Sequence, residues 1–126
     1  MKEEPDWYID EDGDKVWYLP SKGRDYLHRE DGPAIEFQSG ARAWRYCNML
    51  HREDGPALIL SDGSSYWYIR DKLHRLNGPA IETANGNRHW FIEGKELPKE
   101  VEKWLEEENI NLQTMEGQVA LKLRWS

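Results

Sequence analysis

The residues best suited to chemistry recur in three copies of one short element. It reads LHREDGPA at residues 27–34 and again at 50–57, and LHRLNGPA at 73–80. Each copy offers an imidazole and a guanidinium, and the first two add a carboxylate three residues after the histidine. Such groups can ligate a metal, transfer protons or bind phosphate. They give one set of candidate ligand-binding residues, which comprises His28, Arg29, His51, Arg52, His74 and Arg75.

The spacing of the copies argues against a shared metal or catalytic centre. Positions 23 residues apart belong to successive hairpins, so they lie two strands, or about 10 Å, apart. One Zn²⁺ needs each ligand at about 2 Å, and the three histidines therefore cannot converge on it. The third copy also has Leu76 and Asn77 in place of the acids. We predict a periodic turn held by local hydrogen bonds of His, Arg and Asp, with no metal and no cofactor.

Further catalytic signals are missing from the sequence. It contains no GxGxxG, no P-loop, no GxSxG and no HExxH. Cys47 precedes His51 by four residues, but neighbours of this kind are common, and the acids at 106–108 fit a solvated helix end. We therefore expect a protein that is not an enzyme and has no catalytic residues.

A second marker keeps the same 23-residue step. Gly40, Gly63 and Gly86 are each followed four places later by a tryptophan, and Gly13 begins an earlier copy. Each unit has a short apolar run, a Gly-containing turn, and an aromatic and branched run, which is typical of a β-hairpin. The sequence predicts a mainly β chain, an antiparallel meander of 23-residue β-hairpin repeats over residues 13–97.

The tail differs from the repeats. Residues 98–109 place Val101, Trp104 and Leu105 at helical spacing, which predicts an amphipathic helix. Residues 118–125 alternate apolar and polar side chains, which predicts a final strand. We expect residues 1–126 to form a single domain.

Alternation along the strands defines two faces of the predicted sheet. One face collects Trp17, Trp44, Trp67 and Trp90, and we expect Ile35, Leu58 and Ile81 to join it under the covering helix. The other face is rich in aromatic residues and Arg, a composition typical of binding hot spots. Its candidate partner-binding residues are Tyr18, Arg45, Tyr66, Tyr68, His89 and Phe91. These rings alternatively shield the second side of the sheet or stack in a homo-oligomer.

Charge and composition exclude several classes of protein. The chain has 126 residues and a net charge of −7, and its first twelve residues hold six acids and one lysine. Without a basic footprint, nucleic-acid binding is not expected. No apolar run is long enough to span a membrane, and the first residues lack a signal-peptide pattern. The single cysteine, Cys47, fits a reducing cytoplasm.

The order W…G-K…H-R-x-D-G-P-A…D-G resembles the HREDGPA-type hairpin-repeat proteins of large bacteriophages and giant viruses, and is similar to MORN repeats. The resemblance covers about residues 13–97, and Asn48 and Asp71 stand where that pattern usually has Gly. It implies rows of β-hairpins and a viral origin, and it brings no catalytic residue.

We therefore expect a non-enzymatic, phage-type binding protein in the host cytoplasm. It would present a rigid β-sheet surface to a host or viral protein and inhibit a host defence or regulatory factor. One alternative is a sponge that sequesters a small nucleotide-like ligand, and another is a structural or oligomerisation module.

Overall fold

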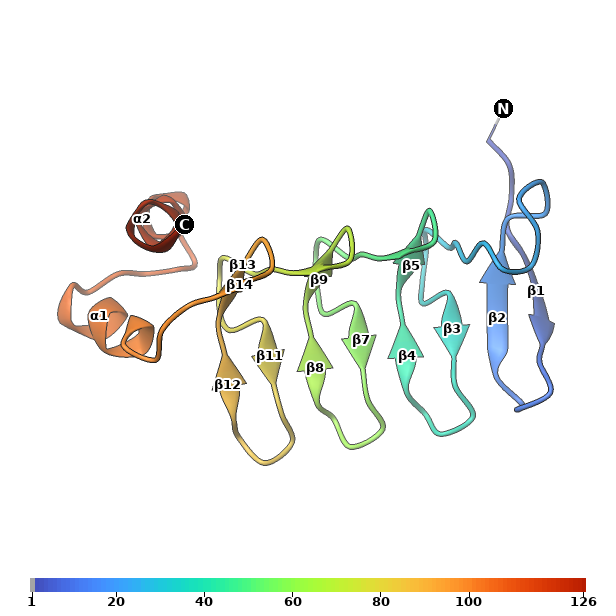
Figure 1. Cartoon of the computed structure of the whole chain (residues 1–126), viewed down its shortest axis with the longest axis horizontal. Helices are drawn as coiled ribbons and strands as arrows, with labels where there is room; N and C mark the ends of the chain where they lie inside the picture. The colour runs from blue at the N-terminus through green and yellow to red at the C-terminus, as the bar shows by residue number, and fades with distance from the viewer. Residues whose placement is uncertain (1) are drawn as a thin grey trace.

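The chain forms a row of β-hairpins closed at one end by two helices (Figure 1). The computed structural model describes residues 2–126. Eight strands form one antiparallel sheet in the order β1-β2-β3-β4-β7-β8-β11-β12, which confirms the predicted meander. These strands are β1 (Asp6–Ile9), β2 (Lys15–Tyr18), β3 (Ile35–Glu36), β4 (Arg42–Ala43), β7 (Leu58–Ile59), β8 (Ser65–Tyr66), β11 (Ile81–Glu82) and β12 (Arg88–His89).

A short second hairpin follows each of the last three long ones. At Trp44 the chain leaves the large sheet, because the Trp44 N–H still donates to Ala57 O while its own C=O accepts from the His51 N–H. The short hairpins therefore project from one edge of the row (Figure 1). Their strands are β5 (Arg45–Tyr46), β6 (Met49–Leu50), β9 (Tyr68–Ile69), β10 (Lys72–Leu73), β13 (Phe91–Ile92) and β14 (Lys95–Glu96).

Both kinds of hairpin turn require left-handed backbone. Gly63, in the long-hairpin turn, has φ +93°, which glycine adopts without steric cost. In the short hairpins the left-handed second turn residue is Asn48 (φ 64°), Asp71 (φ 67°) or Gly94 (φ 84°). Asn and Asp tolerate this region better than other side chains, so their presence where the repeat pattern usually has Gly preserves the turn.

The strand register corrects one predicted face. Ile35 pairs with both Val16 and Ala43, so it lies on the face opposite to Trp17 and Trp44. Leu58 and Ile81 are placed in the same way by their pairing with Tyr66. The prediction that these aliphatic residues share a face with the tryptophans is wrong. Buried alanines lie opposite the indoles instead, namely Ala34, Ala57 and Ala80.

The tail forms two helices rather than a helix and a strand. The predicted helix is confirmed as α1 (Val101–Glu107), but residues 118–125 belong to α2 (Met115–Trp125), so the predicted final strand is wrong. Thr114 caps α2 by accepting the Gly117 N–H, and Leu121 is the large side chain that α2 buries. Alternation of apolar residues therefore did not reflect a two-sided strand, and good helix formers such as Leu and Lys followed the cap.

The helices cover only the end of the row. Val101 of α1, Leu121 of α2 and Leu112 of the segment between them form a buried cluster with Trp90 and Ile92. The prediction that α1 lies across all four tryptophans is therefore wrong. The reason is geometric, since α1 has only seven residues and spans about 10 Å, roughly the width of one repeat.

Candidate functional site

The arginines of the repeated loops are structural residues. Arg52 lies flat on the Trp44 ring of the preceding hairpin, with Cζ 3.9 Å from the ring centroid. Its Nε donates to Asp54 Oδ1 (3.2 Å) and its Nη1 donates to the Pro56 carbonyl (3.0 Å). Arg29 on Trp17 and Arg75 on Trp67 have the same 3.9 Å stacking distance. Two hydrogen bonds of the arginine thus hold each loop in its own conformation, and the cation–π contact holds the loop against the preceding hairpin.

Glycine follows in each loop because the guanidinium passes directly beside it. A Cβ placed on Gly55 would lie 2.7 Å from Arg52 Cζ, and Gly32 and Gly78 have the same relation to their arginines. These glycines do not have positive φ, so close approach, and not turn geometry, requires them. The glycine of the repeated G-P-A sequence therefore leaves the space in which the stacked arginine lies.

The histidines hold successive hairpins together. The Nδ1 atoms of His28, His51 and His74 accept the backbone N–H groups of Cys47 (2.8 Å), Arg70 (3.0 Å) and Glu93 (2.9 Å). An accepting Nδ1 requires the neutral ring with its proton on Nε2. Burial lowers the pKa of His74, an effect that Lys122 strengthens and Glu93 opposes. The predicted local hydrogen bonding is confirmed for the arginines and aspartates. It is wrong for the histidines, because each of them accepts an N–H that lies 19 residues later, in the next hairpin turn.

The candidate ligand-binding residues thus lie one repeat apart, and neighbouring ones share the border of a surface hollow: Arg29, His51 and Arg52 border one, and Arg52, His74 and Arg75 border the next. His28, His51 and His74 each use Nδ1 within the fold, and Arg29, Arg52 and Arg75 are stacked and hydrogen-bonded. In the third copy Asn77 accepts the Arg75 Nε–H in place of an aspartate, and Leu76 packs against the helical cluster. The leucine of that copy therefore follows from its place beside the helices, and Asn77 keeps the hydrogen bond that aspartate makes in the first two copies.

The four repeated tryptophans differ in exposure. Trp17 and Trp90, at the two ends of the row, are each 8% exposed, whereas Trp44 and Trp67 are half-buried. Trp17 is shielded by the Trp7 ring and by Lys15, whose Nζ lies 4.6 Å from the Trp17 centroid. The helices shield Trp90. Only the two middle indoles are left partly open.

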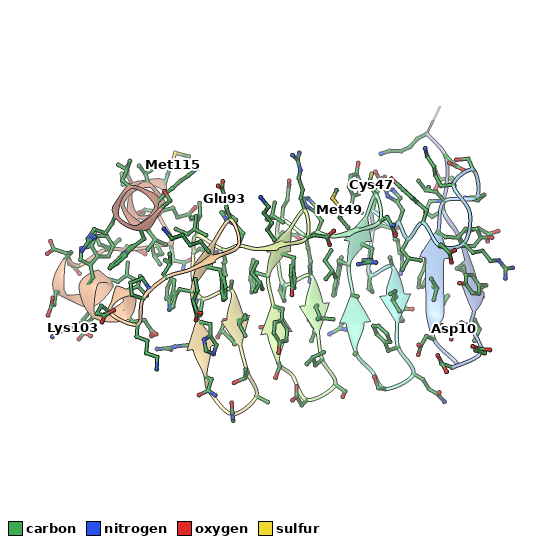
Figure 2. All side chains as sticks on the ribbon, viewed as in Figure 1. Asp10, Cys47, Met49, Glu93, Lys103 and Met115 are labelled. Atoms are coloured by element: carbon green, nitrogen blue, oxygen red, sulfur yellow. The ribbon has the colours of Figure 1, made fainter. Side chains whose placement is uncertain are left out.

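A hollow lies over each of these two indoles, between successive loops. The hollow over Trp44 has a volume of about 1200 Å³, and the one over Trp67 has about 490 Å³ and is partly closed by Gln118 of α2. We call them the Trp44 hollow and the Trp67 hollow. The β5–β6 hairpin, which carries Cys47 and Met49, borders the Trp44 hollow and lies at the edge of the row away from the turn of Asp10 (Figure 2). No local sequence signal predicts this hollow, because the loop that forms it covers a tryptophan of another hairpin.

The rim of the Trp44 hollow is acidic. The outer carboxylates of its two loops are Glu30, Asp31, Glu53 and Asp54. The side chains of Asp31, Asp54 and Glu53 are 85–89% exposed, whereas those of Arg29 and Arg52 beneath them are 21% and 26% exposed. A molecule that approaches the hollow therefore meets these carboxylates before Arg29 and Arg52, and it also meets the exposed Arg70 of the β9–β10 turn, which lines the hollow.

The six candidate partner-binding residues lie on the opposite side, which we call the Tyr face. Tyr66 and His89 pair with Ile81, so these two residues lie on the same face as Ile81. The other four candidates each follow by two residues a position of this face, and alternation places them on the same side; they are Tyr18, Arg45, Tyr68 and Phe91. All six side chains are aromatic or cationic, and all six are half-buried. Half-buried aliphatic residues lie between them on this face. Arg45 Nε is buried and has no hydrogen-bond partner within the described chain. The helices contact Trp90 and Ile92 on the other face, so they leave the Tyr face uncovered.

One acidic trio in the first turn serves the backbone. Asp10, Asp12 and Asp14 bring one oxygen each within 4.8 Å of one another. Asp10 Oδ1 accepts the N–H groups of Asp12 and Asp14, both at 3.0 Å, and Asp14 Oδ1 accepts the Gln38 N–H. These bonds account for the trio as a turn-forming group.

Comparison with known proteins gives no relative on which to build. No family model, curated protein or solved structure matches the chain. Within residues 2–126, neither helix has the length and apolar character needed to cross a membrane.

Proposed function

We propose that the chain is a non-enzymatic binding protein that docks a protein partner on the Tyr face. The observation that carries the proposal is the uncovered row of aromatic side chains and Arg45 on a sheet fixed by its own repeats. A rigid surface loses little conformational entropy on binding, and Tyr and Arg are the residues most often found at binding hot spots.

The use of the loop residues supports a surface role over chemistry. Arg29, Arg52 and Arg75 and the three histidines stabilise the repeats, so catalysis or phosphate binding by them would compete with folding. Arg45, in contrast, has a polar atom without an internal partner. Because that Nε is enclosed by the chain, a carboxylate or carbonyl of a partner would bind the outer nitrogens of this half-buried guanidinium.

The sequence supports a more specific form of the proposal. The resemblance to repeats of large bacteriophages and giant viruses suggests a host or viral protein as the partner, met in the host cytoplasm. Inhibition of a host defence or regulatory factor would then be the consequence of docking.

The experiment is affinity capture from bacterial cells with the wild-type chain, with Arg45→Ala/Tyr68→Ala and with a matched control. The control, Arg124→Ala/Met115→Ala, removes a cation and a large apolar side chain from exposed positions of α2. A partner of the Tyr face is captured by the wild type and by the control and is lost from the first variant, whose far-UV circular dichroism stays unchanged. A protein captured equally by all three contradicts the proposal. Light scattering of each chain alone identifies a second copy as the partner.

A further inference from the structure

A second surface lies behind the Tyr face, and it has a different chemistry. We propose that the Trp44 hollow binds a basic segment of another protein, one that presents Lys or Arg beside apolar side chains. The inference is independent of the proposed function of the Tyr face, because the two surfaces lie on opposite sides of the sheet.

The same repeat position has a different chemistry at the helix-covered end of the row and in its open middle. The space over Trp90 is filled by the helices of the chain itself, and the loop residue that borders it is the apolar Leu76. The corresponding loop residues at the Trp67 and Trp44 hollows are Glu53 and Glu30. The chain therefore pairs an apolar rim with its own apolar helices and leaves the hollow over Trp44 open where the rim is acidic.

The Trp44 hollow combines an apolar inner surface with carboxylates at its rim. Its inner surface includes Trp44, Tyr46 and Met49, which favour apolar contact. The outer carboxylates favour a cation, and the chain itself illustrates this, since Lys2 Nζ lies 2.8 Å from Glu30 Oε2. Lys15 over Trp17 likewise shows a lysine ammonium seated on the repeated indole at the neighbouring position.

The same geometry disfavours a phosphate ligand. The guanidinium groups of Arg29 and Arg52 lie beneath their aspartates and donate inward, to Pro33 O and Pro56 O. A phosphate entering the hollow would meet the exposed carboxylates of Asp31, Glu53 and Asp54 against the one exposed guanidinium of Arg70, so net repulsion would oppose its binding. A basic peptide meets the opposite situation.

The test uses two six-residue peptides, one alternating Lys and Leu and one alternating Glu and Leu. Each is titrated into the ¹⁵N-labelled full chain, and the indole N–H signals of the seven tryptophans are followed. The Lys–Leu peptide is expected to move the Trp44 signal in a saturable, salt-sensitive manner, and the Glu–Leu peptide is not. Unmoved Trp44 with the Lys–Leu peptide, or equal shifts with both peptides, overturns the proposal.

Variants separate the hollow from general attraction to an acidic protein. Glu30→Gln/Glu53→Gln removes two rim charges that are not needed for the Arg–Trp stack, and it is expected to weaken Lys–Leu binding about tenfold. Glu106→Gln/Glu108→Gln removes the same charge from exposed positions near the end of α1 and is expected to leave binding within about twofold. Equal weakening by both pairs overturns the proposal. Arg45→Ala/Tyr68→Ala should bind the peptide as the wild type does, which keeps this test separate from that of the Tyr face.

Discussion

The helix-covered end of the row and its open middle have the same backbone repeat and opposite surfaces. At Trp90 the helices bury the indole to 8% exposure, and Leu76 joins the cluster. Over Trp44 the equivalent space is a hollow of about 1200 Å³ rimmed by carboxylates. The same repeat can therefore form part of a core or an open surface. The residue after the loop arginine differs accordingly, since it is Leu76 at the covered end and Glu30 or Glu53 in the open middle. Four changes test this comparison, in order of decreasing expected effect.

Leu121→Ala should destabilise the covered end most. The side chain is fully buried against Trp90 and its neighbours, so its truncation leaves a cavity and should cost about 2–5 kcal/mol of unfolding free energy. Urea unfolding followed by tryptophan fluorescence measures it. Leu123→Ala, at a position that is 80% exposed in the same helix, is the control and should change stability by no more than about 0.5 kcal/mol. Equal effects of the two variants would show that α2 does not pack as described.

Leu76→Glu gives the third loop the glutamate that the first two loops have after their arginine. It places a carboxylate against the apolar helical cluster and should cost about 2–3 kcal/mol. The reverse change, Glu53→Leu, affects a side chain that is 85% exposed and should stay within about 0.5 kcal/mol. Unfolding free energies of the pair measure the asymmetry, and equal costs would contradict the distinction between a covered end and an open middle.

Arg52→Lys tests whether stacking, and not charge, holds the loops. Lysine keeps the cation but loses the planar contact with Trp44 and the directed bonds to Asp54 and Pro56, which should cost about 1–2 kcal/mol. Arg70→Lys, at an exposed position, is the control and should be neutral. Thermal unfolding is measured for both variants. An Arg52→Lys protein that melts like the wild type would contradict the stacking role.

The smallest effect is expected from pH, through His74. Because burial lowers the pKa of His74 below its unfolded value near 6.5, the folded chain binds fewer protons than the unfolded chain in that range. The contribution of His74 is thus complete above about pH 6.5 and declines as the pH falls toward the folded pKa. His74→Gln should lose less stability than the wild type between pH 7.5 and 5.5 in urea titrations. A loss equal to that of the wild type would mean that the Glu93 N–H bond does not depend on the neutral ring.

Local signals predicted the hairpins well because their chemistry is short-range. The D-G and N-G-like turns, the β-branched and aromatic runs, and the 23-residue step all act within one repeat. The tail was harder. Residues 118–125 alternate like a strand, yet Thr114 caps a helix in which Leu121 is buried and Leu123 is exposed. Alternation gave the wrong period there, because only the packed neighbours reveal which side chains are covered.

The sequence alone determined the row of hairpins, its 23-residue step and which candidate partner-binding residues share one face. These features depend on turn geometry and on alternation along a strand. Tertiary structure decided the rest. It placed Arg52 on the tryptophan of the preceding hairpin, joined His51 Nδ1 to an N–H 19 residues later, and set Ala57 rather than an aliphatic residue opposite Trp44. It also left Trp44 open and covered Trp90. These features depend on the register between strands and on where the helices end the row, which no single repeat encodes.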